Sequence, residues 1–350
     1  MKAAVVTGRR RFEIRELPTP EVRPGTILLK VKRCAICGTD LEYVDNPRWD
    51  AGGAGEEAFK PGEAVLGHEW VGEVVEIGEG VEGWSIGDRA VDIKGSCGRC
   101  YWCRRGLHHL CLGGRVRGTP FEGGGWSSMY GAMAEYVLRP AQGRMKVPDS
   151  VTDEEAALTE PLNVGLSPIY ESGLKAGDSV AILGGGHIGQ LTMLAAKAAG
   201  AAPIIITDLI QSRLDKALEL GANFALNVDE GNVYEQILDI TEAGADVVII
   251  CVRDADVLLQ STMAVRREGT IAIVGFPKPA ELNPIYWLTK HLRIIGCDPM
   301  LRYNIQAMRL MEYKQVDCRA LVSAIMPLED VQKAFDSLYA GENVLVMLKP

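Results

Sequence analysis

The sequence predicts an α/β protein with two parts, a β-rich domain and a doubly wound domain built around a parallel sheet. Residues 1 to about 95 contain short runs in which apolar and polar side chains alternate, which is the period of a half-buried strand. From Thr152 onward, short apolar runs alternate with longer stretches of helical period, which is typical of a parallel sheet flanked by helices. A glycine-rich turn at residues 184–189 joins one such run to one such stretch.

The N-terminal part fits a compact β-rich domain. Residues 27–32 form one expected strand, and residues 70–77 alternate at period two. Two glycine-rich spans, 46–62 and 113–131, are expected to be long loops. Such loops are either functional or plain solvent-exposed excursions.

The remainder of the chain predicts the parallel sheet. Thr152 is expected to cap a helix that begins at Asp153. Strands and helices then alternate over 180–183, 188–200, 203–208, 211–220, 223–227, 233–241, 246–251, 256–266 and 269–275, with a sixth strand at 292–296. The tail, with helices at 303–313 and 328–340 and a strand at 344–348, is expected to return to the first domain. The domains are therefore predicted as residues 1–155 with 297–350, and residues 156–296.

The turn Gly184-Gly185-Gly186-His187-Ile188-Gly189 has the pattern of a dinucleotide site. Gly184 allows a tight turn, Gly186 lets the backbone approach a pyrophosphate, and Gly189 lets the helix pack closely on the strand. Free N–H groups at the helix start and the positive end of its dipole would hold the phosphate charge. A structural turn is the alternative, but the two flanking strands, the helix and a following acid favour dinucleotide binding.

That acid, Asp208, lies 19 residues after Gly189, where a carboxylate accepts hydrogen bonds from the adenosine ribose. A carboxylate there repels the ribose phosphate of NADP, and residues 209–211 bring no positive charge. Arg213 follows, either as a solvated helix position or as part of the nucleotide site. The sequence therefore favours NAD over NADP.

Length, charge and hydropathy limit the possible function classes. A chain of 350 residues with 47% hydrophobic and 24% charged residues is typical of a two-domain globular protein. The formal charge of −9 argues against nucleic acid or an anionic membrane as a partner. We find no apolar run of about 18 residues that would span a membrane and no signal-peptide pattern at the start, so we expect a cytoplasmic protein.

Four of the nine cysteines lie within fifteen residues, as Cys97, Cys100, Cys103 and Cys111. Thiols at this spacing can surround one Zn²⁺ tetrahedrally. Two disulfides or an iron–sulfur cluster are the alternatives, but a reducing cytosol disfavours the first, and the second more usually carries proline after the last cysteine. The pattern favours a structural zinc that leaves no position for a substrate.

A second group of metal-ligating residues is spread along the chain. Cys37 and Thr39 lie in a Cys-Gly-Thr-Asp turn, and His68 and Glu69 lie in a Gly-His-Glu turn about thirty residues later. Glu160, in a Thr-Glu-Pro-Leu segment, lies where the two predicted domains meet. Cysteine, histidine and one carboxylate can bind Zn²⁺ and leave a fourth position open.

Together, these motifs resemble the zinc-containing medium-chain dehydrogenases, over essentially the whole chain. The Cys-Gly-Thr-Asp turn, the Gly-His-Glu turn, the four-cysteine segment and the late dinucleotide fold occur in the family's order. The Glu-Pro-Leu segment is similar to that of the sorbitol, threonine and polyol dehydrogenase branch. The resemblance implies a GroES-like catalytic domain and a Rossmann cofactor domain.

The resemblance also implies roles for single residues. Cys37, His68 and a glutamate, either Glu69 or Glu160, would bind a catalytic zinc that acts as a Lewis acid on the substrate hydroxyl, and Thr39 would pass on its proton. The nicotinamide would accept the hydride. The implied cofactor-binding residues besides the glycines, Asp208 and Arg213 are His187, Ile188, Val252 and Val274.

Two positions depart from the family pattern. Glu42 stands where many members of the branch have a histidine in the proton exit, so either Glu42 or water passes the proton. Arg253 stands among residues that are often small in relatives, and it would bind an anionic group or form a salt bridge in the loop.

The leading hypothesis is a zinc-dependent oxidoreductase that transfers a hydride from a secondary alcohol, namely a polyol, sugar or amino alcohol, to NAD. The alternatives are an NADP-dependent aldehyde or ketone reductase on the same scaffold and a nucleotide-binding regulator without turnover. The resemblance further implies a homodimer or homotetramer.

Overall fold

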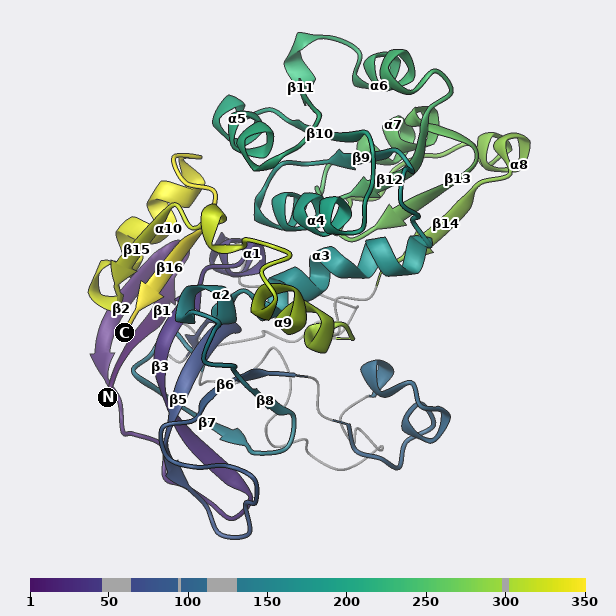
Figure 1. Ribbon diagram of the computed structural model, residues 1–350. Coiled ribbons are helices and arrows are strands. Elements are labelled where there is room, and N and C mark those ends of the chain that lie inside the picture. The colour runs from purple at the N-terminus through teal and green to yellow at the C-terminus, as the bar shows by residue number, and fades with distance from the viewer. Residues whose placement is uncertain (46–63, 94–95, 112–130, 298–301) are drawn as a thin grey trace. The chain divides into compact units, whose positions relative to one another are not determined.

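The computed structural model describes residues 1–45, 64–93, 96–111, 131–297 and 302–350 (Figure 1). The expected loop at 46–62 and nearly all of that at 113–131 lie outside these residues. The chain divides into two compact units, Met1–Glu160 with Val322–Pro350, and Pro161–Leu321. Among the described residues, no helix has the length and apolar character needed to cross a membrane.

The first unit is dominated by β-structure. A three-stranded sheet has the order β2-β1-β4, and a larger sheet has the order β15-β16-β3-β5-β6-β8, with β7 paired to β3. The strands are β1 (Lys2–Gly8), β2 (Arg11–Glu16), β3 (Thr26–Ala35), β4 (Ala64–Val65), β5 (Glu69–Ile77), β6 (Arg89–Asp92), β7 (Tyr136–Pro140), β8 (Arg144–Lys146), β15 (Ala324–Pro327) and β16 (Val346–Lys349). The helices are α1 (Gly38–Asp45), α2 (Asp153–Ala157) and α10 (Val331–Tyr339), with short 3₁₀ turns at Cys103–Arg105, His108–Leu110 and Leu328–Asp330.

The long antiparallel pair β3–β5 organises this unit. Ile27 lies opposite Ile77 at one end, and Ala35 lies opposite Glu69 at the other. The register shifts twice between these ends, first past Val75 in β5 and then past Lys32 in β3. Because the extra residues lie in different strands, the register at the Ala35 end is the same as at the Ile27 end.

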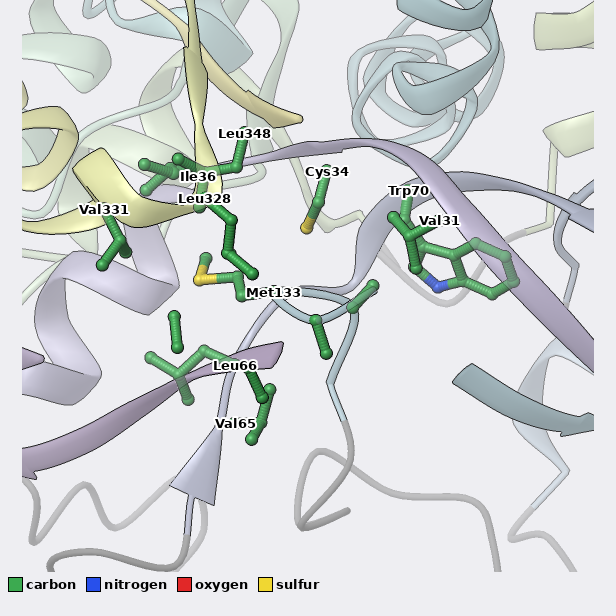
Figure 2. Close-up of a cluster of buried hydrophobic side chains, with 14 of the residues drawn as sticks. Val31, Cys34, Ile36, Val65, Leu66, Trp70, Met133, Leu328, Val331 and Leu348 are labelled. Carbon is green, nitrogen blue, oxygen red and sulfur yellow. The ribbon is translucent and has the colours of Figure 1, made fainter. Parts of the chain in front are cut away.

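The hydrophobic core of the unit lies against this pair (Figure 2). Figure 2 shows Val31, Cys34 and Trp70 from β3 and β5 together with Met133 and with Leu348 of the last strand. Trp70 is 2% exposed and lies opposite Cys34 in the register. Since successive strand residues point to opposite faces, Glu69 points away from the face that Trp70 buries.

The second unit contains a six-stranded sheet in which every pair is parallel, in the order β11-β10-β9-β12-β13-β14. This is the doubly wound order with its switch point between β9 and β12. The strands are β9 (Val180–Leu183), β10 (Ile204–Asp208), β11 (Phe224–Asn227), β12 (Ala245–Ile250), β13 (Val265–Ile273) and β14 (Arg293–Gly296). The helices, coloured teal to yellow-green in Figure 1, are α3 (Thr159–Ser172, which begins in the first unit), α4 (His187–Ala198), α5 (Gln211–Leu220), α6 (Val233–Thr241), α7 (Val257–Ala264), α8 (Ile285–Lys290) and α9 (Asn304–Glu312), with 3₁₀ turns at Val228–Glu230 and Arg319–Leu321.

The predicted cap of α2 is confirmed. Thr152 Oγ1 accepts a hydrogen bond from the Glu155 N–H at 3.2 Å, and Glu155 Oε2 accepts one from the Thr152 N–H at 2.8 Å. This reciprocal pair is a capping box, which satisfies two N–H groups that the helix itself leaves unbonded.

The division of the chain differs from the expected one after β14. Residues 302–321 are grouped with the second unit, and only Val322–Pro350 return to the first. Contacts of Tyr303 account for this grouping. Its N–H donates to Asn163 Oδ1 at 2.6 Å, and its ring stacks on Tyr170 with 4.9 Å between centroids. Since α3 and α9 are joined in this way, α9 packs with the parallel-sheet unit.

Candidate active site

A cluster of three potential metal ligands lies at one end of the β3–β5 pair. Cys37 follows β3 by two residues and His68 directly precedes β5, so the pairing of Ala35 with Glu69 brings the two turns together. Ligand atoms of Cys37, His68 and Glu69 all lie within 4.8 Å of one another. Strand pairing thus assembles ligands that are about thirty residues apart in the sequence.

Gly67 makes the close approach possible. Its φ is +102°, a conformation that L side chains rarely adopt, and a Cβ there would lie 2.6 Å from Cys34 Sγ and 2.9 Å from the Met133 nitrogen. The turn before His68 therefore depends on glycine for both its backbone conformation and its packing.

Asp40 orients the cluster, and the sequence analysis assigned it no role. Its side chain is 6% exposed, Oδ2 accepts a hydrogen bond from the Cys37 N–H at 3.0 Å, and Oδ1 lies 3.7 Å from His68 Nδ1. An aspartate three residues after a cysteine in a turn that opens a helix was the available signal, because such side chains bond to nearby backbone N–H groups.

The electrostatics of the cluster favour a cation. Burial opposes a charge on His68, but the carboxylates of Asp40 and Glu160 outweigh it and raise the pKa of the imidazole. Both carboxylate oxygens of Glu69 are buried, and the residue is 0% exposed. A buried carboxylate is costly unless a positive charge or hydrogen bonds compensate it. Thiol, imidazole and carboxylate together are a donor set that suits Zn²⁺, so the residues fit a catalytic zinc.

The other predicted residues of this site lie on α1 and α3. Thr39 and Glu42 are three residues apart in α1, so they lie on one face of that helix. The Thr39 hydroxyl oxygen is buried and makes no hydrogen bond within the described part of the chain. Glu160 lies in the first turn of α3 and acts on the pKa of His68, but it does not belong to the cluster within 4.8 Å among the described residues.

The four-cysteine segment forms a second potential metal site. The Sγ atoms of Cys100 and Cys103 are 3.4 Å apart, those of Cys100 and Cys111 are 3.9 Å apart, and those of Cys97 and Cys103 are 4.0 Å apart. A tetrahedral Zn²⁺ with Zn–S bonds of about 2.3 Å separates its sulfurs by about 3.8 Å. All nine cysteines, which lie in the described ranges, are free of disulfides. The geometry fits a structural zinc.

Backbone N–H groups support thiolates in this segment. The Cys97 N–H donates to Cys111 Sγ at 3.3 Å, and the N–H groups of Arg99 and Cys100 lower the pKa of Cys97 to about 6. The lower pKa of Cys97 favours metal binding at neutral pH, because the thiolate is the ligand, whereas burial raises the pKa of Cys103 to about 11.

In the second unit, the glycine turn joins β9 to α4. Gly184 has φ +110° and packs so closely on Val252 that a Cβ would overlap it. A Cβ at Gly189 would likewise overlap the Gly184 carbonyl oxygen, whereas one at Gly186 would meet nothing within 4 Å. Two glycines therefore serve close packing, and Gly186 leaves room in front of the N-terminus of α4.

Asp208 ends β10 beside this turn and is 8% exposed. Its Oδ2 accepts a hydrogen bond from the Gly185 N–H at 2.8 Å, and its Oδ1 accepts one from the Ile210 N–H at 2.9 Å. Arg213 Nη1 lies 3.5 Å from Asp208 Oδ2, and the Arg213 side chain is 25% exposed. Arg213 is thus an ion-pair partner of the acid and not a solvated helix position.

The remaining predicted cofactor residues lie at the carboxyl ends of neighbouring strands. His187 and Ile188 begin α4, and Val252 and Val274 follow β12 and β13. Parallel sheets bind ligands at this edge, near the switch point. The residues of the second unit therefore fit a dinucleotide. Arg253 lies with its guanidinium carbon 6.0 Å from the Phe276 ring centroid, a cation–π contact that the sequence did not suggest.

Comparisons with known proteins agree with the two domains that the sequence predicts. Residues 23–149 match the model of the alcohol dehydrogenase GroES-like domain, and residues 188–312 match that of the zinc-binding dehydrogenase. These matches confirm the expected GroES-like and Rossmann domains.

Relatives cover the whole chain. Sorbitol dehydrogenase of Bacillus subtilis is 34% identical over 100% of this chain and 97% of its own length. L-threonine 3-dehydrogenase of Pyrococcus horikoshii is 33% identical over 96% of this chain and 95% of its own length. The crystal structure of 2R,3R-butanediol dehydrogenase from Bacillus subtilis matches 100% of this chain and 99% of its own, with 31% identity and a TM-score of 0.84.

These relatives are enzymes, and they do not favour the alternatives of a reductase or a regulator without turnover. The family uses zinc and a nicotinamide cofactor. The chain is a member of the zinc-containing medium-chain dehydrogenase family, in its sorbitol and polyol branch, and is an oxidoreductase that acts on alcohols.

Proposed function

We propose that the enzyme oxidises a secondary hydroxyl of a polyol, sugar or amino alcohol and transfers the hydride to NAD. The cluster of Cys37, His68 and Glu69 within 4.8 Å carries this proposal. The sorbitol, threonine and butanediol of the relatives' names support the substrate class, since each has a secondary hydroxyl beside a second polar group.

Cys37, His68 and one carboxylate hold the catalytic zinc. When bound, zinc supplies Lewis acidity to the substrate hydroxyl, and the nicotinamide supplies the hydride acceptor. The burial of Glu69 and its place in the cluster support it as the carboxylate ligand. Glu160 is the alternative, because its charge reaches His68. Cys97, Cys100, Cys103 and Cys111 hold the structural zinc.

Thr39 and Glu42 move the proton. Thr39 Oγ1 accepts the proton of the substrate hydroxyl and donates its own, because a hydroxyl is both donor and acceptor. Glu42, on the same face of α1, is the next acceptor in this relay. The buried Thr39 hydroxyl, without a hydrogen bond in the described chain, supports this role.

The second unit, Pro161–Leu321, binds NAD, and the first unit, Met1–Glu160 with Val322–Pro350, is the catalytic domain. Gly184, Gly186, Gly189, His187 and Ile188 hold the pyrophosphate at the start of α4. Asp208 accepts hydrogen bonds from the adenosine ribose, and Val252 and Val274 line the nicotinamide end. The buried Asp208 carboxylate supports NAD over NADP, because it repels a ribose phosphate.

We also propose a cytoplasmic homodimer or homotetramer. The nine free cysteines support a reducing compartment. An apolar surface at one edge of the second unit supports self-association, since β14 is an edge strand and Leu288 is 69% exposed beside Ile285 at 48%.

The decisive experiment combines metal analysis with turnover. Purified protein is expected to hold two zinc ions per chain and to reduce NAD with sorbitol, threonine or butanediol, and Cys37→Ala is expected to abolish turnover while one zinc remains. Preference for NADP with aldehydes would support the reductase instead. Two bound zinc ions without oxidation of any alcohol by either cofactor would support the regulator.

A further inference from the structure

Gln190 connects the two segments that form the adenosine end of the nucleotide site. We propose that Gln190 is a positioning residue, which holds the glycine turn and the first turn of α5 in the placement where Gly185, Asp208 and Arg213 meet. The inference rests on the proposed function, in which this turn binds NAD.

The contacts of Gln190 reach both segments. It lies in the first turn of α4 and is 0% exposed. Its Nε2 donates to the Gly185 carbonyl at 3.1 Å and to the Arg213 carbonyl at 2.7 Å. One side chain therefore bridges the turn after β9 and the first turn of α5.

The orientation of the amide follows from its partners. Both groups that face it are backbone carbonyls, which only accept hydrogen bonds. The NH₂ group has two hydrogens to donate, whereas the opposite orientation would place a third carbonyl oxygen against these two. A glutamine amide thus satisfies both carbonyls at once.

Further bonds close a ring around Asp208. The Gly185 N–H donates to Asp208 Oδ2 at 2.8 Å, and Arg213 Nη1 lies 3.5 Å from the same oxygen. Both backbone polar groups of Gly185 are therefore bonded: its N–H donates to Asp208, and its carbonyl accepts from Gln190. Arg213 is held at its carbonyl by Gln190 while its guanidinium reaches the acid.

The two carbonyls account for a buried amide at this position. An apolar side chain of similar size would avoid the cost of burying the amide, but it would leave the Gly185 and Arg213 carbonyls without their donor. Buried Thr192, also in α4, bonds back to the Ile188 carbonyl of its own helix at 2.8 Å and lies 3.8 Å from Cys251 Sγ, without reaching the glycine turn or α5. Gln190 instead bonds to the glycine turn and to the first turn of α5, the two segments that contact Asp208, which is the acid proposed to select the cofactor.

The test separates the two halves of the cofactor. In Gln190→Leu, calorimetry should show ADP-ribose and NAD binding about tenfold more weakly, equivalent to about 1.4 kcal/mol, and nicotinamide mononucleotide binding as in the wild type. The KM for NAD should rise by the same factor, with kcat unchanged. Gln190→Met, which is unbranched and fills buried space, should behave in the same way.

Ser261→Ala is the matched control. Ser261 is 0% exposed and bonds to the Leu258 carbonyl within α7, so the change removes a buried hydrogen bond far along the chain from the turn. The melting temperature of Ser261→Ala should fall, while its affinities for ADP-ribose, NAD and nicotinamide mononucleotide stay unchanged.

Several outcomes would overturn the inference: unchanged ADP-ribose affinity in a folded variant, an equal loss for nicotinamide mononucleotide, or failure of both Gln190 variants to fold. If wild-type protein binds neither NAD nor ADP-ribose, the proposed function fails as well, so the two failures are distinguishable.

Discussion

Asp40 Oδ1 lies 3.7 Å from His68 Nδ1, while Asp40 Oδ2 accepts a hydrogen bond from the Cys37 N–H at 3.0 Å. One buried carboxylate thus contacts two of the three clustered ligand residues. Because Nδ1 of His68 faces Asp40, Nε2 is the nitrogen that we expect to bind the proposed zinc.

Asp40→Asn is expected to weaken catalytic zinc binding by about 10–100-fold, the usual cost of losing a carboxylate that supports a metal-ligating histidine. Metal content after dialysis against graded chelator measures the effect. Asp45→Asn is the control, since Asp45 is also in α1 but pairs with Arg9 and Arg10. Equal zinc retention in Asp40→Asn and the wild type would contradict the role.

The two metal sites should separate by mutation. Cys100→Ser is expected to reduce zinc from two ions to one per chain and to lower the melting temperature, because zinc held by four thiolates contributes directly to folding. Cys37→Ser should also leave one zinc but abolish turnover, with a smaller change in melting temperature. Retention of two zinc ions by Cys100→Ser would refute the structural site.

Gly67→Ala should destabilise the protein by about 2–3 kcal/mol or more, since it adds backbone strain to a steric overlap with Cys34 and Met133. Gly80→Ala is the matched control. Gly80 has φ +75° but nothing within 4 Å of a Cβ, so only the strain of about 1 kcal/mol remains. Denaturant unfolding compares the two, and equal losses would mean that the close packing at Gly67 contributes nothing.

Asp208→Ser should shift the ratio of kcat/KM for NAD to that for NADP by at least about tenfold toward NADP, or about 1.4 kcal/mol. The change removes the repelling carboxylate and releases the Arg213 guanidinium from its ion pair. Asp229→Ser, at an exposed acid of the same unit, should leave the ratio unchanged. An unchanged ratio in Asp208→Ser would argue against discrimination by this acid.

Asp246 should make stability depend on pH in the acid range. Burial alone would raise its pKa, but hydrogen bonds from Ser179 and an ion pair with Arg266 lower it below 3.8. A carboxyl with a depressed folded-state pKa stabilises the protein above its unfolded pKa of about 3.9 and loses this contribution as pH falls through the folded value.

Asp246→Asn should therefore lower the free energy of unfolding by about 1.5 kcal/mol at pH 7. This difference from the wild type should shrink below about pH 4. Thermal unfolding across pH measures this difference. Asp239→Asn, at an exposed position of α6, should lie within about 0.5 kcal/mol of the wild type throughout. A deficit independent of pH would show that charge is not the cause.

Most of the parallel-sheet unit could be predicted from the sequence. The run 180–183 and the helix 211–220 coincide with β9 and α5, because glycines or turn residues bound apolar segments of clear period. The helix α3 was not expected, since it contains Pro161, Gly165 and Pro168. The packing of α3 against α4 accounts for the helix. At Gly165 the two helices lie so close that a Cβ would be 2.9 Å from the Leu191 backbone. Close packing on α4 outweighs poor helix propensity.

The start of β13 was also missed. A helix was expected over 256–266 and a strand over 269–275, whereas α7 ends at Ala264 and β13 begins at Val265 and contains Glu268 at φ +57°. Strand pairing with β12 holds this irregular segment, and no local pattern reveals such pairing.

Motifs predicted the residues that cluster, but not the side chains that position them. Cys37, His68 and Glu69 were predicted from their turns, and pairing of β3 with β5 brings them together. Asp40 and Gln190 were missed because their partners are backbone groups and a side chain positioned by the tertiary fold. Only Asp40 carried a signal in the sequence, namely its place three residues after Cys37 in a turn that opens a helix.

The bulges of β3 and β5 make the candidate metal site tolerant of changes in strand length. Lys32 and Val75 are extra residues, and the residues on either side of each keep their partners in the other strand. Because a bulge takes up one added residue locally, the ladder continues in register beyond it. Ala35 therefore stays opposite Glu69, and the turns of Cys37 and His68 stay together, whether or not the middle of each strand carries its extra residue.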